Sequence, residues 1–145
     1  MRKIVASTAA TAAFLLSACQ SAPAVGSAGA PGATGAVQEF LAAAHGGDVR
    51  TMASLFGTSS GSITQRDDPN SVEKRMRALQ CYVTHDAAKV LEDRPAASGP
   101  GRQVVVELRQ GNLTRRTTFS TVPGPHDRWF VESFDIAAVT DLCHP

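Results

Sequence analysis

Glu132 is the residue of this chain best placed for acid–base chemistry. It falls between Phe130 and Phe134 in a segment with strand periodicity, so these three side chains are expected on one face. Burial among aromatic rings favours the protonated carboxyl, as a general base working near neutral pH requires. The alternative is that this face meets solvent, or that Glu132 pairs with an arginine on the neighbouring strand, such as Arg116. We favour this alternative.

The histidines and their acidic neighbours do not add a second catalytic set. His85-Asp86 and His126-Asp127 are adjacent pairs, and adjacent side chains point to opposite faces of a strand and lie about 100° apart on a helix. There is no nucleophile elbow and no phosphate-binding glycine loop after a strand. No metal-ligand spacing such as C-x-x-C or H-E-x-x-H occurs among the four histidines, His45, His85, His126 and His144. The sequence therefore predicts no metal and no cofactor.

Two short helices are predicted before residue 58. Glycine tolerates the backbone conformation that ends a helix, so Gly46-Gly47 and Gly57 are expected to stop them. Asp48 is placed to cap the second helix, and the two form a helical hairpin. Their apolar residues recur at helical spacing: Val37, Phe40, Leu41 and Ala44 in the first, and Val49, Met52, Ala53 and Phe56 in the second.

A third helix is predicted after a polar loop at 58–69. The loop is a candidate lid over a site, and the alternative is a surface excursion without a function. Asn70 and Glu73 have the spacing of a capping box at the start of this helix. Cys81 lies off the apolar stripe, so either it faces a tail that crosses the outer side of the helix, or the helix ends before it. The stripe itself is Val72, Met76, Leu79 and Val83.

After residue 86 the apolar period changes to two, which predicts strands. They are expected at 89–94, 103–110, 113–122 and 128–135, followed by a tail or a short helical turn. Gly111-Asn112 has the composition of a hairpin turn. Helices followed by hairpin-linked strands indicate the α+β class, with two or three helices packed on one face of an antiparallel sheet of about four strands.

The order of the elements and the closing segment 127–131 (Asp-Arg-Trp-Phe-Val) resemble the nuclear-transport-factor-two-like fold over residues 36–143. A cystatin-like or other helix-plus-meander fold is the alternative. The resemblance implies a cone-shaped domain in which a curved sheet and its helices enclose a pocket, with Phe130, Glu132 and Phe134 as candidate lining residues. Some members of that family bind small molecules, a few are isomerases or hydratases, and many dimerise, so a homodimer is also implied.

The first nineteen residues resemble the signal of a bacterial lipoprotein. Arg2 and Lys3 precede an apolar run at 4–16 that is too short to span a bilayer, for which about 20 residues are needed. Residues 16–19 (Leu-Ser-Ala-Cys) then match a lipobox. In that family the Cys19 thiol receives a diacylglycerol and residues 1–18 are removed as the signal peptide. An ordinary secretory signal is the alternative. Gln20, in place of the aspartate that retains some lipoproteins in the inner membrane, favours the outer membrane.

Residues 19–35 are expected to be the lipidated cysteine and a flexible Ala/Gly/Ser/Pro tether, and residues 36–145 a single domain. Sixteen tether residues have an r.m.s. span of ~20–25 Å. Cys81 and Cys143 remain as an even pair in an exported, oxidising setting, so they are expected to form a disulfide. Two free buried thiols are the alternative.

The charge of the mature chain excludes a strong electrostatic attraction to nucleic acid. Of 14 Lys+Arg, Arg2 and Lys3 leave with the signal, so 12 face 13 Asp+Glu, a formal charge of −1 with neutral histidines. Our leading hypothesis is a non-catalytic module of the bacterial cell envelope, anchored in the membrane by the lipid at Cys19, that binds a small apolar ligand or an envelope protein. The alternatives are a small isomerase- or hydratase-like enzyme using Glu132, and a structural accessory lipoprotein.

Overall fold

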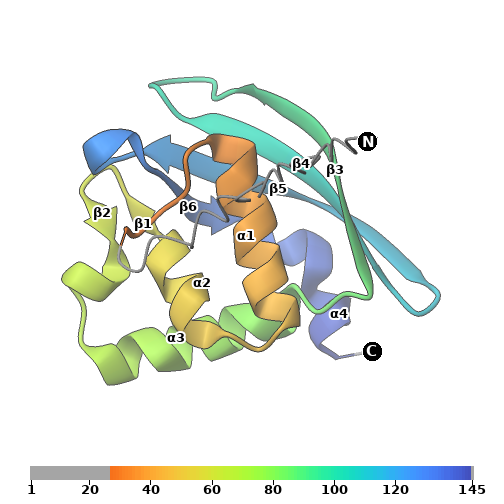
Figure 1. Cartoon of the computed structure of the whole chain (residues 1–145). Coiled ribbons are helices and arrows are strands. Elements are labelled where there is room, and N and C mark those ends of the chain that lie inside the picture. Colours follow the sequence, from red (N-terminus) through yellow and green to blue (C-terminus); the bar gives the residue numbers. More distant parts are fainter. Residues whose placement is uncertain (1–26, 145) are drawn as a thin grey trace, which may run out of the picture.

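The computed structural model describes residues 27–144, which form an α+β fold with the first three α-helices before the main sheet, as the sequence predicts (Figure 1). The predicted signal peptide, Cys19 and the first part of the predicted tether lie outside these residues. The helices are α1 (Ala33–His45), α2 (Val49–Leu55), α3 (Pro69–Tyr82) and α4 (Thr140–Cys143). The main strands are β3 (Ala87–Pro95), β4 (Arg102–Gln110), β5 (Leu113–Pro123) and β6 (Trp129–Phe134).

The domain begins earlier than the sequence predicts. Ala30 is 0% exposed and pairs with Trp129 through two backbone hydrogen bonds, and α1 starts at Ala33. The expected tether boundary at residue 35 is therefore wrong. Alanine has the highest helix propensity and buries without side-chain entropy, so an alanine-rich stretch can dock where its composition resembles a linker.

Asp48 caps α2 as predicted. Its carboxylate accepts hydrogen bonds from the Thr51 backbone N–H at 3.0 Å and from the Thr51 hydroxyl at 2.6 Å. The Thr51 hydroxyl and backbone bonds hold the pKa of Asp48 below its usual value. The helical hairpin of α1 and α2 is thus fixed at its turn by the residue type that the sequence indicates.

The expected capping box of α3 is wrong, because the helix begins one residue before Asn70. Pro69 is the first residue of the helix, where a missing backbone N–H costs nothing. Asp68 is the N-cap, and its carboxylate accepts hydrogen bonds from the backbone N–H groups of Asn70 and Ser71 at 3.1 Å. Glu73 instead pairs with Arg77 one turn later. The helix continues to Tyr82, so Cys81 lies on it and faces the C-terminal tail.

Part of the polar stretch 58–69 packs against the domain, and most of its other residues are exposed, as a surface loop predicts. It contributes to a two-stranded sheet of β1 (Gly57–Thr58) and β2 (Gly61–Ser62) and a 3-10 turn, η1 (Ile63–Gln65), with Ile63 buried. The Ser62 hydroxyl donates to the Ala53 carbonyl at 2.8 Å. Gly57 faces Gly61 so closely that a Cβ at Gly57 would collide with the Gly61 carbonyl oxygen. This close approach requires glycine at position 57.

The main sheet has the order β3-β4-β5-β6, with every pair antiparallel. One end of the sheet holds Trp129, which pairs with Pro123, and the opposite end holds Ala87, which pairs with Arg109. We call these the Trp129 end and the Ala87 end. The ladder is irregular twice, between Val90 and Glu92 in β3 and between β5 and β6. Such bulges turn the following side chains to the other face.

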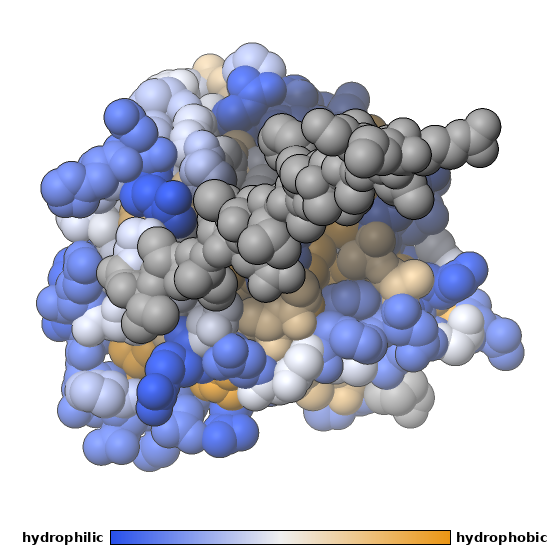
Figure 2. All heavy atoms as spheres, in the orientation of Figure 1, coloured by the Kyte–Doolittle hydropathy of each residue, from blue (hydrophilic) through white to orange (hydrophobic). Residues whose placement is uncertain are grey.

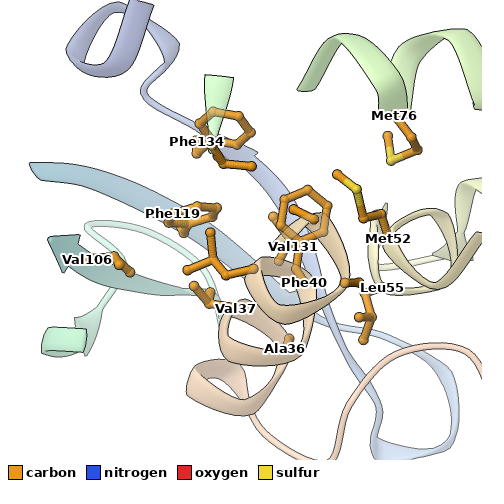
Figure 3. Close-up of a cluster of buried hydrophobic side chains, with 14 of the residues drawn as sticks. Ala36, Val37, Phe40, Met52, Leu55, Met76, Val106, Phe119, Val131 and Phe134 are labelled. Carbon is orange, nitrogen blue, oxygen red and sulfur yellow. The ribbon is translucent and has the colours of Figure 1, made fainter. Parts of the chain in front are cut away.

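The hydrophobic core lies between the helices and one face of this sheet (Figure 3). Phe40 of α1 is 0% exposed and meets Phe119 of β5, with ring centroids 6.3 Å apart. Phe119 in turn contacts Phe134 of β6 at 5.0 Å. Outside the core, hydrophilic surface dominates the visible face, and hydrophobic surface gathers over α1 and the sheet beside it (Figure 2).

The C-terminal segment is held by three kinds of contact. Cys143 of α4 forms a disulfide with Cys81 of α3, with their Cα atoms 4.7 Å apart, which confirms the predicted pair. Arg115 of β5 donates to both carboxylate oxygens of Asp141, and these bonds hold the pKa of Asp141 below its usual value. Leu142 is 1% exposed. Helix α4 is therefore fastened to α3 and to β5 at once.

A polar network fastens the start of α1 to the sheet. The Thr34 hydroxyl donates to the Asp93 carboxylate at 2.6 Å, and Arg102 donates to its other oxygen. Partial burial opposes ionisation of Asp93, but the bonds from Thr34 and Arg102 outweigh it, and the pKa of Asp93 is lowered. Because the folded pKa lies below the unfolded one, this stabilisation is present above pH ~4 and is lost as the pH falls further.

Candidate functional site

Glu132 does not lie in an enclosed site. Ser120 pairs with Ser133 and Thr121 with Val131, so Glu132 is the extra residue of a bulge. Glu132 and Ser133 are both exposed, whereas Phe134 returns to the core. The expectation that Glu132 shares a face with Phe130 and Phe134 is wrong, because the bulge breaks the period of two. The proposed partner Arg116 pairs with Glu107 instead, at 3.1 Å.

Phe130 and Phe134 belong to different faces of the sheet. Phe130 is 2% exposed but lies apart from the main core cluster. Its ring is covered by backbone, since a Cβ at Gly29 or Gly124 would come within 2.8 Å and 2.6 Å of it. Phe130 therefore closes a small secondary cluster at the Trp129 end, and Phe130, Glu132 and Phe134 do not line one pocket.

The structure instead forms a hollow between α1 and the first half of β3, with a volume of about 330 Å³, which we call the α1–β3 hollow. Six of its ten lining residues are apolar, and the other four carry an amide, two imidazoles and a carboxylate. In Figure 2 hydrophobic surface lies beside α1 on this side of the visible face. The lining residues are Gln38, Leu41, Ala42, His45, His85, Asp86, Ala87, Ala88, Val90 and Val106.

His45 and His85 form one wall of this hollow. Their ring centroids are 5.2 Å apart with the planes tilted by 37°. His45 Nδ1–H donates to the His85 carbonyl at 2.9 Å, and His85 Nδ1–H donates to the Val83 carbonyl at 2.7 Å. With Nδ1 carrying the proton in both neutral rings, each Nε2 is left as a hydrogen-bond acceptor.

Asp86 is positioned by the β4–β5 turn. Its carboxylate accepts from the Gly111 backbone N–H at 2.7 Å, and its own N–H donates to the Arg109 carbonyl at 2.7 Å. Gly111 has φ +54, a left-handed conformation that glycine adopts without strain. Asp86 therefore holds the start of β3 in place and adds a negative charge to the rim.

The wall of His45 and His85 also borders a second, smaller depression of about 270 Å³. Arg77 and Gln80 of α3 line it, and the Gln80 amide donates to the Ala44 carbonyl at 2.9 Å. The histidine pair thus separates the α1–β3 hollow, which carries the Asp86 carboxylate, from the smaller depression, which carries the Arg77 guanidinium. Both histidines and six apolar residues belong to the lining of the α1–β3 hollow, so a ligand there would lie beside both kinds of side chain.

Sequence reasoning missed this hollow because its two halves are forty residues apart in the chain. His45 ends α1 and His85 precedes β3, and only the packing of α1 against the sheet brings them together. The one local signal is that each histidine stands at the boundary of an element, His45 at the end of α1 and His85 just before β3. His85 does not bond to its neighbour Asp86, since its Nδ1–H donates to the Val83 carbonyl and Asp86 accepts from Gly111. His126 and Asp127 both lie in the 3-10 turn η2 (Pro125–Asp127) before β6.

Within residues 27–144, no three His, Cys, Asp or Glu side chains come together as a metal site would need. In the same part of the chain, no helix has both the length and the apolar character to cross a bilayer. Comparison with protein-family models, with curated proteins and with solved structures gave no match to this chain. The geometry of the site is therefore the basis of the functional argument.

Proposed function

We propose that this protein is a lipid-anchored binding module of the bacterial cell envelope, which holds a small, mainly apolar ligand in the α1–β3 hollow. The observation that carries the binding part is the composition of the hollow. Ligand sites are concave, mostly apolar and furnished with a few polar groups that fix orientation. At about 330 Å³ the hollow is at the small end of that class, which suits a ligand of one or two rings or a short chain.

The lining suggests the chemistry of the ligand. Ala42, Ala88 and the half-buried Val90 offer aliphatic contact above the buried Leu41 and Val106, and the Nε2 atoms of His45 and His85 offer hydrogen-bond acceptors. A ligand with an apolar body and one hydroxyl or N–H donor satisfies both. Asp86 on the rim disfavours a strongly anionic ligand.

A protein partner on the free edge of β3 is the second candidate. This strand is the edge of the main sheet, and Leu91 is 38% exposed at its bulge. An edge strand can accept an added strand. However, Lys89, Pro95 and the bulge are devices by which proteins prevent such pairing, so the hollow is the better supported site.

Filling the hollow tests the binding proposal. Ala42 is exposed on α1 and lines the hollow, so Ala42→Phe places a ring in it without disturbing the core. An uncharged naphthol, measured by calorimetry, is expected to bind the unmodified protein and to bind Ala42→Phe at least tenfold more weakly. Anilinonaphthalene sulfonate is the parallel fluorescent probe, and it should bind more weakly than the naphthol because Asp86 disfavours its sulfonate.

Glu39→Phe is the matched control, because Glu39 is exposed on the same helix but does not line the hollow. It should bind both probes as the unmodified protein does. If neither probe binds the unmodified protein, or if Ala42→Phe binds as well as Glu39→Phe, the hollow is not a ligand site.

Replacing the lipid-accepting residue tests the anchoring proposal. Cys19→Ala is expected to move the protein from the membrane fraction to the soluble fraction, or to leave an unprocessed precursor, because a lipidated cysteine supplies the two or more acyl chains that stable anchoring needs. The measurement is fractionation of expressing cells, with incorporation of labelled palmitate. Cys81→Ser, which leaves residue 19 intact, should still incorporate palmitate. If Cys19→Ala stays in the membrane fraction as the unmodified protein does, the proposed lipid anchor is wrong.

A further inference from the structure

His45 and His85 of the α1–β3 hollow can each take up a proton without losing the hydrogen bond that holds the ring. A backbone carbonyl only accepts hydrogen bonds, so the Nδ1 atoms that face the carbonyls of His85 and Val83 carry a proton in every charge state. Protonation therefore occurs at Nε2, and both hydrogen bonds persist in the imidazolium form. The wall changes its charge while its rings stay in place.

Both rings are placed where they can exchange protons with the surroundings. His45 is exposed, and His85, although only 8% exposed, lines the α1–β3 hollow and the smaller depression beside it. Histidine is the side chain whose ordinary charge change falls between about pH 5 and 8. The charge of this wall is therefore the feature of the hollow that responds to pH.

Few other charges face the pair. Among the described residues that line the two depressions, α1 and β4 contribute only uncharged side chains apart from His45, and the charged groups are Asp86, just before β3, and Arg77 of α3. Arg77 is already paired with Glu73 at 2.7 Å. Asp48 follows the end of α1, but its carboxylate caps α2. Asp86 therefore sets the charge of the α1–β3 hollow while both rings are neutral.

The sign of this charge inverts when the rings are protonated. With neutral rings, the carboxylate of Asp86 gives the lining a formal charge of −1, and two imidazolium rings change it to +1. The ring centroids are 5.2 Å apart, so the two positive charges repel each other. A carboxylate beside them relieves that repulsion. An anionic ligand and the protons of the wall therefore favour each other's binding.

We propose that the His45–His85 pair makes the α1–β3 hollow a pH-dependent site for small apolar carboxylic acids, which bind as carboxylates when the wall is protonated and only weakly when it is neutral. The apolar body of such a ligand lies against Ala42, Ala88 and Val90. An uncharged ligand of the same shape binds in both states. This pH dependence rests on the proposed ligand site, and it adds the charge class of the ligand and its regulation.

Calorimetry with naphthoate and naphthol, at about pH 8 and about pH 5.5, tests the proposal in the full-length protein. Neither ligand changes its own charge between these values, so a difference arises in the protein. The affinity for naphthoate is expected to rise at least about tenfold at the lower pH, because two charges change beside the carboxylate. Naphthol, whose hydroxyl can donate to a ring or accept from it, should change less than about threefold. Naphthoate binding should also take up protons, so its heat should depend on the ionisation enthalpy of the buffer.

Replacing both histidines by asparagine removes the charge change. In His45→Asn with His85→Asn, an amide N–H takes the place of each Nδ1–H and can keep the bond to the carbonyl, but the amide takes up no proton. Naphthoate should bind this variant equally weakly at both pH values, while naphthol still binds. If the double variant does not fold, His45→Asn alone, which changes an exposed side chain, should lose part of the rise.

His126→Asn is the matched control. His126 is exposed, does not line the α1–β3 hollow, and has φ 58, which asparagine tolerates. This variant should keep the full rise in naphthoate affinity.

The outcomes separate the site from its regulation. Naphthol that binds at neither pH would refute the proposed ligand site itself. If naphthol binds but the naphthoate affinity does not change with pH, or if the rise survives unchanged in the asparagine variants, the pH dependence alone is wrong. A tenfold change for naphthol in step with naphthoate would also overturn the proposal, because it would mean that the fold, and not the charge of the wall, changes with pH.

Discussion

Removing the disulfide between Cys81 and Cys143 is expected to lower the free energy of unfolding by about 4 kcal/mol, because the bond closes a loop with a sequence separation of 62 residues. In the chain-entropy model the cross-link acts mainly on the unfolded chain, which loses conformations when its ends are joined. For a domain with ~5–15 kcal/mol of total stability, this is a large share.

The contacts around α4 do not replace the disulfide. The ion pair of Arg115 and Asp141 has side chains that are 37% and 41% exposed, and exposed pairs contribute little. Leu142 and Val139 are buried, but a helix of 4 residues has no stability of its own. Once the bond is opened, α4 is expected to fray first and to uncover the α3 face around Cys81.

Urea denaturation of the unmodified protein with and without reductant measures this effect, beside the double variant Cys81→Ser with Cys143→Ser. Both reduced and double-variant proteins should unfold at the same, lower urea concentration, and the double variant should not respond to reductant. A lipidated Cys19 is a thioether and does not enter the exchange. A midpoint that reductant leaves unchanged in the unmodified protein would show that the bond does not stabilise the fold.

Much of the fold follows from apolar periodicity alone. The stripe that begins with Val37 and Phe40 faces the core, and Val104, Val106 and Leu108 of β4 are all buried, as a period of two requires. The disulfide followed from the two cysteines that remain once Cys19 is assigned to the lipid, in a chain expected to be exported. The periodicity is local, and the disulfide follows from counting cysteines. Both can therefore be predicted without knowing which elements pack against each other.

The features that the sequence did not predict depend on contacts between distant segments. Ala30 is buried because its backbone forms an isolated antiparallel β-bridge with Trp129. An Ala/Gly composition does not distinguish such a docked segment from a flexible linker. Glu132 turned to solvent because one extra residue opposes Ser120 and Thr121, and a bulge leaves no mark in the pattern of hydrophobicity. The hollow requires α1 to lie against β3, which neither segment specifies by itself.

Replacing Phe40 by alanine is expected to lower the free energy of unfolding by about 3–5 kcal/mol, comparable to the loss of the disulfide. Phe40 is 0% exposed, and its ring lies 6.0 Å from that of Phe56 and 6.3 Å from that of Phe119. Figure 3 shows it within the cluster, with Phe119 on one side and Met52 on the other. Truncation removes contacts to the end of α2 and to the sheet at the same time. Because the cavity would be walled by two rigid elements, the neighbouring side chains cannot move in to fill it.

Glu39→Ala is the matched control, since Glu39 is the exposed neighbour of Phe40 on α1 and its truncation should change stability by less than ~0.5 kcal/mol. Phe40→Leu, which keeps most of the apolar volume, should fall between the two. Urea denaturation followed by circular dichroism gives all three values. A loss below ~1 kcal/mol for Phe40→Ala would mean that α1 is not the element around which the core is packed. The disulfide joins α3 to α4, whereas Phe40 lies on α1, so the two losses should add. Phe40→Ala in reductant is expected to lose about 7–9 kcal/mol, enough to unfold a domain in the lower part of the usual ~5–15 kcal/mol range.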